Sequence, residues 1–235
     1  MTNPPLFFGL FGILGAVIYA VGDVLLLAGK AKLEDHPKLQ PHIKILSGAE
    51  KMAELPHPRL IWGGLLGVFA TPLVLVGFMQ ILISSRVGDE LMFPPFLLFA
   101  LATIVGAFVH GSFIYLGEYV QALDKVGNDS QFVITEMLKH HRAIMIVTYG
   151  FLLTCILVAS IWFSILVGMD RTYYPVWMAA FNPVTLFAIW MFIKRFLPRF
   201  VKDWTEGAGF NIAYLLFFTL TTITFYSADW GNFVL

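Results

Sequence analysis

Long apolar stretches alternate with shorter polar segments along the whole chain. Each stretch is about as long as a helix that crosses a bilayer, which needs roughly 20 predominantly apolar residues. The stretches cover residues 6–29, 60–84, 94–122, 143–168, 175–196 and 210–226. Because a bilayer offers no water to unpaired backbone groups, such spans are expected to be helices. The pattern predicts an all-α, polytopic membrane protein in which residues 1–235 form one bundle of six transmembrane helices.

The composition is typical of an integral membrane protein. Hydrophobic residues make up 58% of the chain and charged residues only 13%, whereas a soluble domain has roughly 25% charged residues. The formal net charge is zero, so the chain lacks the basic surface of a nucleic-acid-binding protein and no nucleic-acid partner is expected. Cys155 is the only cysteine, which excludes a disulfide within the chain.

The distribution of basic residues predicts how the chain is oriented. Of the 15 Lys and Arg residues, all except Arg86 and Arg171 follow the first, third and fifth apolar stretches. The positive-inside rule then places three loops, about 30–59, 123–142 and 197–209, in the cytoplasm and both termini outside. The bacterial inner (plasma) membrane is the expected location. No Lys or Arg precedes the long first stretch, so we interpret it as a retained transmembrane helix and not as a signal peptide.

Three ionisable residues inside the predicted spans are the candidate catalytic residues. Asp23, His110 and Glu118 all fall on the predicted cytoplasmic side, and charged groups are costly in a bilayer unless they have a function or a partner. Polar residues of the spans are candidates for binding a substrate: Tyr115, Gln121, Asn182, Asn211 and Tyr214. Because all of them except Asn182 lie toward the same side, polar groups of several helices are expected to converge on one leaflet.

Helix geometry separates the two candidates of the third span. His110 and Glu118 are eight residues apart, which corresponds to roughly 12 Å along a helix and a rotation of about 80°. They cannot form a direct hydrogen bond, although both could border one cavity. Thr103 and Gln121 lie more nearly in line with His110 and give that face a polar character.

Each candidate also has a purely structural interpretation. Asp23 could form a hydrogen bond to a neighbouring helix, and His110 could be a satisfied interior histidine. Glu118 could be solvated among interfacial aromatic residues. Asn182 could satisfy backbone groups that a proline kink frees. Asp229, close to the outer interface, is expected to be solvated.

A metal site is a weaker hypothesis. His140 and His141, together with Asp23, His110 and Glu118, are suitable ligand types for zinc, but they come from three segments without a diagnostic spacing. The adjacent histidines could equally anchor the next span at the interface. The sequence requires no cofactor, and the HExxH, dinucleotide-binding and P-loop motifs are absent.

The preferred functional hypothesis is a membrane-embedded enzyme with a cavity that opens on the cytoplasmic leaflet. Its substrate would be lipid-like or isoprenoid-like, and aromatic residues, 16% of the chain, would line the cavity. Asp23 or Glu118 would act as the acid or base and His110 would donate or shuttle a proton. Hydrolysis would need an activated water molecule, and a metal ion such as zinc could activate it.

Two other classes of function remain open at this point. A small-solute or proton-coupled transporter would use Asp23 and His110 as a proton relay, although the two halves of the chain show no clear internal symmetry. A non-catalytic membrane scaffold or sensor would bind a partner through its cytoplasmic loops. A homodimer is compatible with each of these, and membrane lipid is the expected surrounding partner.

Overall fold

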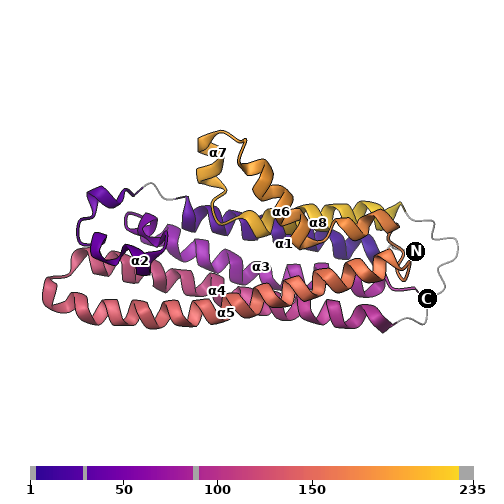
Figure 1. Cartoon of the computed structure of the whole chain (residues 1–235), viewed down its shortest axis with the longest axis horizontal. Helices are drawn as coiled ribbons and strands as arrows, with labels where there is room; N and C mark the ends of the chain where they lie inside the picture. Colours follow the sequence, from indigo (N-terminus) through magenta and orange to yellow (C-terminus); the bar gives the residue numbers. More distant parts are fainter. Residues whose placement is uncertain (1–3, 29–30, 87–89, 228–235) are drawn as a thin grey trace.

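The structure is a computed structural model that describes residues 4–28, 31–86 and 90–227 (Figure 1). Within these residues there is no strand beyond an isolated bridge between Ser85 and Thr172. Among them, five helices are long and apolar enough to cross a membrane. These are α1 (Pro4–Leu27), α3 (His57–Ile83), α4 (Phe93–Lys125), α5 (Asn128–Gly168) and α8 (Gly209–Tyr226). The prediction of an all-α bundle of membrane type is confirmed.

Short helical elements connect or extend the long helices. Between α1 and α3 the chain forms the 3-10 helices η1 (Leu33–Asp35), η2 (Gln40–His42) and η3 (Ala49–Met52) and the α-helix α2 (Ile43–Leu46). The others are η4 (Glu90–Met92), η5 (Val176–Ala180), α6 (Pro183–Lys194) and α7 (Arg199–Trp204). α6 packs against α8, and Figure 1 shows the chain turning away from the bundle after it, so that α7 projects from the side.

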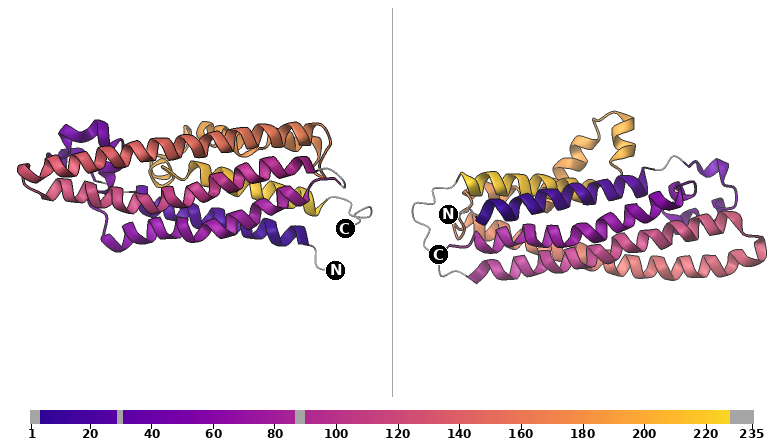
Figure 2. Two further views of the ribbon diagram at one scale, coloured as in Figure 1. Left: turned by 90° about the horizontal axis from the view of Figure 1, so that it is seen from below. Right: turned by 180° about the vertical axis from the view of Figure 1, so that it is seen from behind.

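The long helices run side by side along one axis (Figure 2). α1 packs against α3 and α8, α3 packs against α4, and α4 packs against α5. α1 begins and α8 ends at the same end of the bundle, which we call the terminal end (Figures 1 and 2). The opposite end, called the loop end, carries residues 31–56 and the turn between α4 and α5.

The predicted span over 175–196 is not one continuous helix. The chain forms η5, breaks at Phe181, and restarts as α6 with Pro183 at its first position. The Asn182 side chain accepts hydrogen bonds from the backbone N–H groups of Val184 and Thr185 at 2.9 and 3.0 Å, which caps the new helix. α6 has only 12 residues, about 18 Å. Pro183 therefore begins a short helix and does not kink a long one.

The predicted loop over 123–142 is also largely helical. α5 begins at Asn128 and continues without a break to Gly168, so that His140 and His141 lie within the helix and not before it. Its 41 residues correspond to about 60 Å, twice the thickness of a bilayer core. The helices α4 and α5 thus form a long hairpin at the loop end. The predicted end of the first span, Gly29, and the predictions for Lys30 and Asp229 fall outside the described residues.

Two hydrophobic cores fill the bundle. The core at the terminal end is rich in stacked aromatic rings, including Phe78, Phe99 and Phe217. The core at the loop end is aliphatic and includes Leu26, Leu60 and Leu123 together with buried side chains of residues 31–56. These loop residues are therefore part of the folded body.

Apolar side chains also cover the outside of the long helices. On α1, the exposed positions Leu10, Leu14, Val17 and Val21 recur at helical spacing. α5 exposes a comparable face. Contiguous apolar surface of this size is unusual on a soluble monomer and is suited to contact with lipid chains.

Candidate functional site

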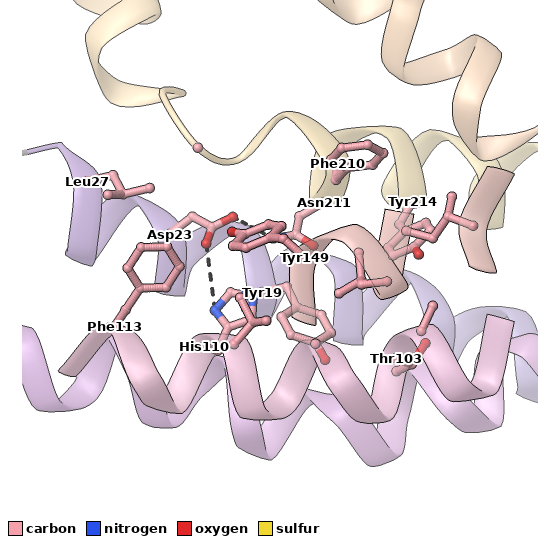
Figure 3. Close-up of a pocket in the computed structure, with 16 residues that line it drawn as sticks. Tyr19, Asp23, Leu27, Thr103, His110, Phe113, Tyr149, Phe210, Asn211 and Tyr214 are labelled. Atoms are coloured by element: carbon pink, nitrogen blue, oxygen red, sulfur yellow. Dashed lines mark hydrogen bonds and ion pairs between the residues drawn. The ribbon is translucent and has the colours of Figure 1, made fainter. Parts of the chain in front are cut away.

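A cavity of about 100 Å³ lies where the two hydrophobic cores meet. Its walls come from α1, α4, α5 and the start of α8 (Figure 3). Most of the lining is apolar or aromatic, and a few polar side chains project into it, as in a typical small-molecule site. The polar lining residues are Tyr19, Asp23, Thr103, His110, Tyr149, Asn211 and Tyr214.

The Asp23 carboxyl group is buried, with 6% of the residue exposed. Asn211, in the first turn of α8, donates a hydrogen bond from its side-chain nitrogen to Asp23 Oδ2 over 2.5 Å. The other carboxyl oxygen, Oδ1, is 3.7 Å from His110 Nδ1 on α4. Figure 3 shows both contacts on the Asp23 side chain. Three helices that are far apart in the sequence therefore join at this one carboxyl group.

The His110 ring is held between α1 and α3. It packs on the Tyr19 ring with centroids 4.7 Å apart and planes inclined by 35°. On its other side lies Gly67, where a Cβ atom would overlap the imidazole ring. Gly67 thus leaves the space that the ring occupies. No hydrogen-bond partner for His110 Nδ1 is found in the part of the chain that the structure describes.

A short hydrogen-bond chain fixes the ring that supports His110. The Thr71 hydroxyl group donates to Gly67 O over 3.1 Å. Its oxygen is 2.6 Å from the Tyr19 hydroxyl group, which therefore acts as the donor to Thr71. This arrangement ties α1 to α3 directly behind the imidazole. The orientation of His110 is set by packing and by a neighbour that is itself hydrogen-bonded.

The distance between Asp23 and His110 has a chemical consequence. At 3.7 Å the two groups are too far apart for a hydrogen bond, which rarely exceeds about 3.2 Å between N and O. Each keeps free capacity to accept or donate a proton toward the cavity. A carboxyl group and an imidazole that face one cavity are the side chains most often used in general acid–base catalysis.

One known family matches almost the whole chain. The model of a family of unknown function, DUF6796, covers residues 5–228. The chain belongs to this family. No curated protein and no solved structure gives a significant match to the chain. Because the function of DUF6796 is unknown, membership assigns no activity to the chain.

The structure brings four of the sequence-predicted site residues of this DUF6796 chain together. Asp23, His110, Asn211 and Tyr214 all line the cavity. Their pairing was not evident from spacing, because the residues come from different helices whose rotation depends on packing.

Four other candidates lie elsewhere. Glu118 is half-buried and Tyr115 is 58% exposed, and neither lines the cavity. The Gln121 side chain donates to Met52 O and Leu55 O at 3.1 and 2.8 Å, which attaches residues 31–56 to α4. Asn182 caps α6 and donates to Ser164 Oγ at 2.9 Å. In the structure the side chains of Gln121 and Asn182 thus bind other parts of the chain and do not line the cavity.

The two weak metal candidates do not approach the cavity. His140 is exposed, and the His141 ring stands edge-on to Tyr119 at 5.7 Å. Within residues 4–28, 31–86 and 90–227, no group of three or more His, Cys, Asp or Glu side chains is placed to hold a metal ion.

Two cavity residues were missed by sequence reasoning. Tyr19 precedes Asp23 by exactly one i,i+4 step, which places both on the same face of α1, and this spacing could have identified it. Tyr149 lies inside an apolar span on α5. A tyrosine in the middle of such a span is a polar group at membrane depth, so it was a detectable, though weak, signal.

Proposed function

We propose that the protein is a membrane-embedded enzyme that performs acid–base chemistry on a lipid-like or isoprenoid-like substrate. The observation that carries the proposal is the pair of a buried carboxyl group and a buried imidazole, 3.7 Å apart and facing one mainly apolar cavity. Ionisable groups are expensive in an apolar interior, and Asp23 Oδ1 and His110 Nδ1 form no hydrogen bond with each other at 3.7 Å. Their retention without a mutual hydrogen bond is explained if a substrate interacts with both.

The contacts around the pair support a division of acid and base roles between its two members. Asn211 holds one oxygen of Asp23 and leaves the other directed toward His110. In an isomerisation, one member of the pair would remove a proton from a substrate carbon while the other delivers a proton to a neighbouring carbon. The substrate then loses one proton and gains one. Transfer of a proton from one group of the pair to the other restores the starting state of the site. In a hydration, the same groups would activate water and protonate the carbon.

The membrane orientation is part of the same proposal. The loop end carries residues 31–56, which contain Lys32, Lys38, Lys44 and Lys51, and the α4–α5 hairpin, which contains Lys125 and Lys139. The positive-inside rule favours a cytoplasmic location for this end, in a bacterial inner membrane. A substrate would then reach the cavity from the cytoplasmic leaflet.

A comparison of lipid extracts tests the enzymatic proposal. Cells that produce the wild-type protein are compared by mass spectrometry with cells that produce Asp23→Asn or His110→Ala. We expect at least one lipid product in the wild-type extract that is lost in both variants. Asp129→Asn and His57→Ala, which change an exposed aspartate and an exposed histidine, are the matched controls and should retain the product. Identical extracts from all strains would refute the proposal.

A proton-coupled transporter is the second candidate, and a specific observation favours it. Further polar side chains, including Gln80 and Thr221, are fully buried nearer the terminal end, and Thr222 Oγ1 lies 3.3 Å from Gln80 Oε1. A relay would need polar groups on both sides of the aromatic core. Uptake into proteoliposomes that stops when the proton gradient is collapsed would support this candidate over the enzyme.

A further inference from the structure

Three neighbouring cavities lie one after another between the surface beside α7 and the Asp23–His110 pair. The inner cavity shares the lining residues Leu27, Phe113 and Gly207 with a middle cavity of about 250 Å³. The middle cavity shares Lys51 and Glu206 with an outer groove of about 580 Å³. The three spaces therefore follow one another, with a few side chains between each pair.

The polarity of the walls changes along this path. The outer groove is strongly charged, with Lys32, Lys51, Arg199, Asp203 and Glu206 in its lining. The middle cavity is mostly apolar beyond the Lys51–Glu206 pair, and its lining includes Leu27, Leu46, Phe113 and Leu116. The inner cavity is apolar and aromatic around the Asp23–His110 pair. A molecule that matches all three spaces has a charged head and an apolar chain.

The charges of the outer groove select the sign of the head group. Lys51 forms an ion pair with Glu206, and Arg199 lies 3.9 Å from Asp203. With both carboxylates assigned to these pairs, the exposed Lys32 gives the groove one positive charge in excess. Lys51 and Arg199 can also turn toward an anion, because an ammonium has three donors and a guanidinium has five.

The groove lies beside the element best suited to a membrane surface. Phe200 and Trp204 of α7 line it and are 67% and 60% exposed. Aromatic residues mixed with basic ones are typical of the interface between lipid head groups and chains. The ligand would therefore come from the lipid phase and not from bulk water.

We propose that the outer groove binds the phosphate or carboxylate head of a single-chain anionic amphiphile whose chain passes through the middle cavity to the Asp23–His110 pair. The distance is short, because Leu27 at the boundary is one helical turn, about 6 Å, from Asp23. The proposal names the substrate class for the proposed enzyme and in that respect rests on it. Its binding part can be tested without turnover.

The test uses a long-chain alkyl monophosphate with a photoreactive diazirine at the chain end, and the alcohol of the same chain as its uncharged counterpart. The purified full-length protein is irradiated with each probe, and the labelled peptides are mapped. We expect labelling of the inner-cavity walls, with a yield about tenfold higher for the phosphate, as one or two charge-assisted hydrogen bonds provide.

Variants separate the head-group site from the chain path. Lys32→Gln combined with Lys51→Gln should reduce the phosphate yield to that of the alcohol, whereas Lys32→Arg should preserve it. Lys139→Gln, which removes an exposed lysine paired with Glu136, is the control and should leave the yield unchanged. Leu27→Trp should block the inner labelling with both probes.

The labelling result tests binding of the amphiphile separately from the proposed enzymatic activity. The ratio of phosphate to alcohol labelling should be the same for Asp23→Asn as for the wild type, because Asp23 lies beyond the head-group site, even though this variant should abolish any product. Equal yields for phosphate and alcohol in the wild type, or a phosphate preference that survives the double Lys variant, would overturn the head-group site. Labelling confined to the protein surface would overturn the chain path.

Discussion

Asp23 shows at the scale of one residue how the bundle retains a carboxyl group in its interior. The hydrogen bond from Asn211 provides one partner, and the cavity leaves the opposite oxygen available. A buried polar group that loses its partner carries its full desolvation cost. Asn211 therefore stabilises the site as well as the contact between α1 and α8.

Replacing Asn211 by Ala should lower the free energy of unfolding. We expect a loss of about 1–3 kcal/mol, because Asp23 Oδ2 would remain buried without its donor. The midpoint of thermal unfolding of the detergent-purified variant is the measurement. Thr148→Ala removes a side chain that bonds only its own helix and serves as the control. An unchanged midpoint for Asn211→Ala would show that the Asp23–Asn211 contact contributes nothing.

Gly67 and Gly150 form a matched pair for testing how the position of the His110 ring depends on the space at Gly67. Ala at Gly67 would bring its Cβ into the imidazole ring, whereas Ala at Gly150 meets no atom within 4 Å. Gly67→Ala should therefore displace His110 and abolish the proposed product. Gly150→Ala should keep it and gain up to about 1 kcal/mol in stability from its better helix propensity. Equal activity of the two variants would contradict the role given to Gly67.

At this scale the sequence singled out the two residues that meet at the cavity, but it did not give their geometry. Asp23 and His110 stood out because ionisable groups are rare inside apolar spans. Glu118 satisfied the same criterion, but the rotation of α4 carries it away from the cavity. That rotation depends on close packing at glycines such as Gly64 and Gly67, and a single sequence does not reveal which glycines form such contacts.

At the scale of elements, His36 provides one of the contacts that attach residues 31–56 to α4. Its Nδ1 atom is 2.8 Å from Asp124 Oδ2 on α4, and its Nε2 atom is 3.4 Å from Glu54 Oε1. The hydrogen bond to Asp124 is the main cause that raises the pKa of His36 above its usual 6.5. The protonated imidazole therefore holds this loop segment against the bundle.

The attachment of this segment should weaken as the pH rises. Because the pKa of His36 is raised in the folded state, its stabilisation is fully present below the unfolded value of about 6.5 and is lost as the pH passes the raised pKa. Hydrogen exchange of residues 31–56 should accelerate, beyond its intrinsic pH dependence, as the pH rises above about 6.5. His36→Gln should remove this excess. A variant with the same excess as the wild type would contradict the assignment.

The elements themselves were predictable to different degrees. Hydropathy located the five long helices within a few residues, apart from the early start of α5 at Asn128. It failed at residues 175–196, because a hydropathy window does not register that the Asn182 side chain caps a new helix at Pro183. An Asn-Pro pair in a span is better interpreted as a helix start than as a kink when a Thr follows three residues after the Asn.

At the scale of the whole molecule, the orientation in the membrane is a prediction with a direct test. Lys139 lies on the α4–α5 hairpin at the loop end, and the exposed Met169 lies at the opposite end of α5. In a Cys155→Ser background, a membrane-impermeant maleimide should label Met169→Cys in intact spheroplasts. It should label Lys139→Cys only after permeabilisation. The reverse pattern would invert the orientation.

The central claim is that Asp23 and His110 exchange protons with a bound substrate. Membranes that contain the wild-type protein, incubated in heavy water, test it most directly. Acid–base chemistry at carbon should introduce deuterium at a non-exchangeable position of at least one lipid, detected by mass spectrometry. The account predicts that this label appears with the wild type and is absent with Asp23→Asn and His110→Ala. Equal labelling with all three proteins, or no label with any of them, would contradict it.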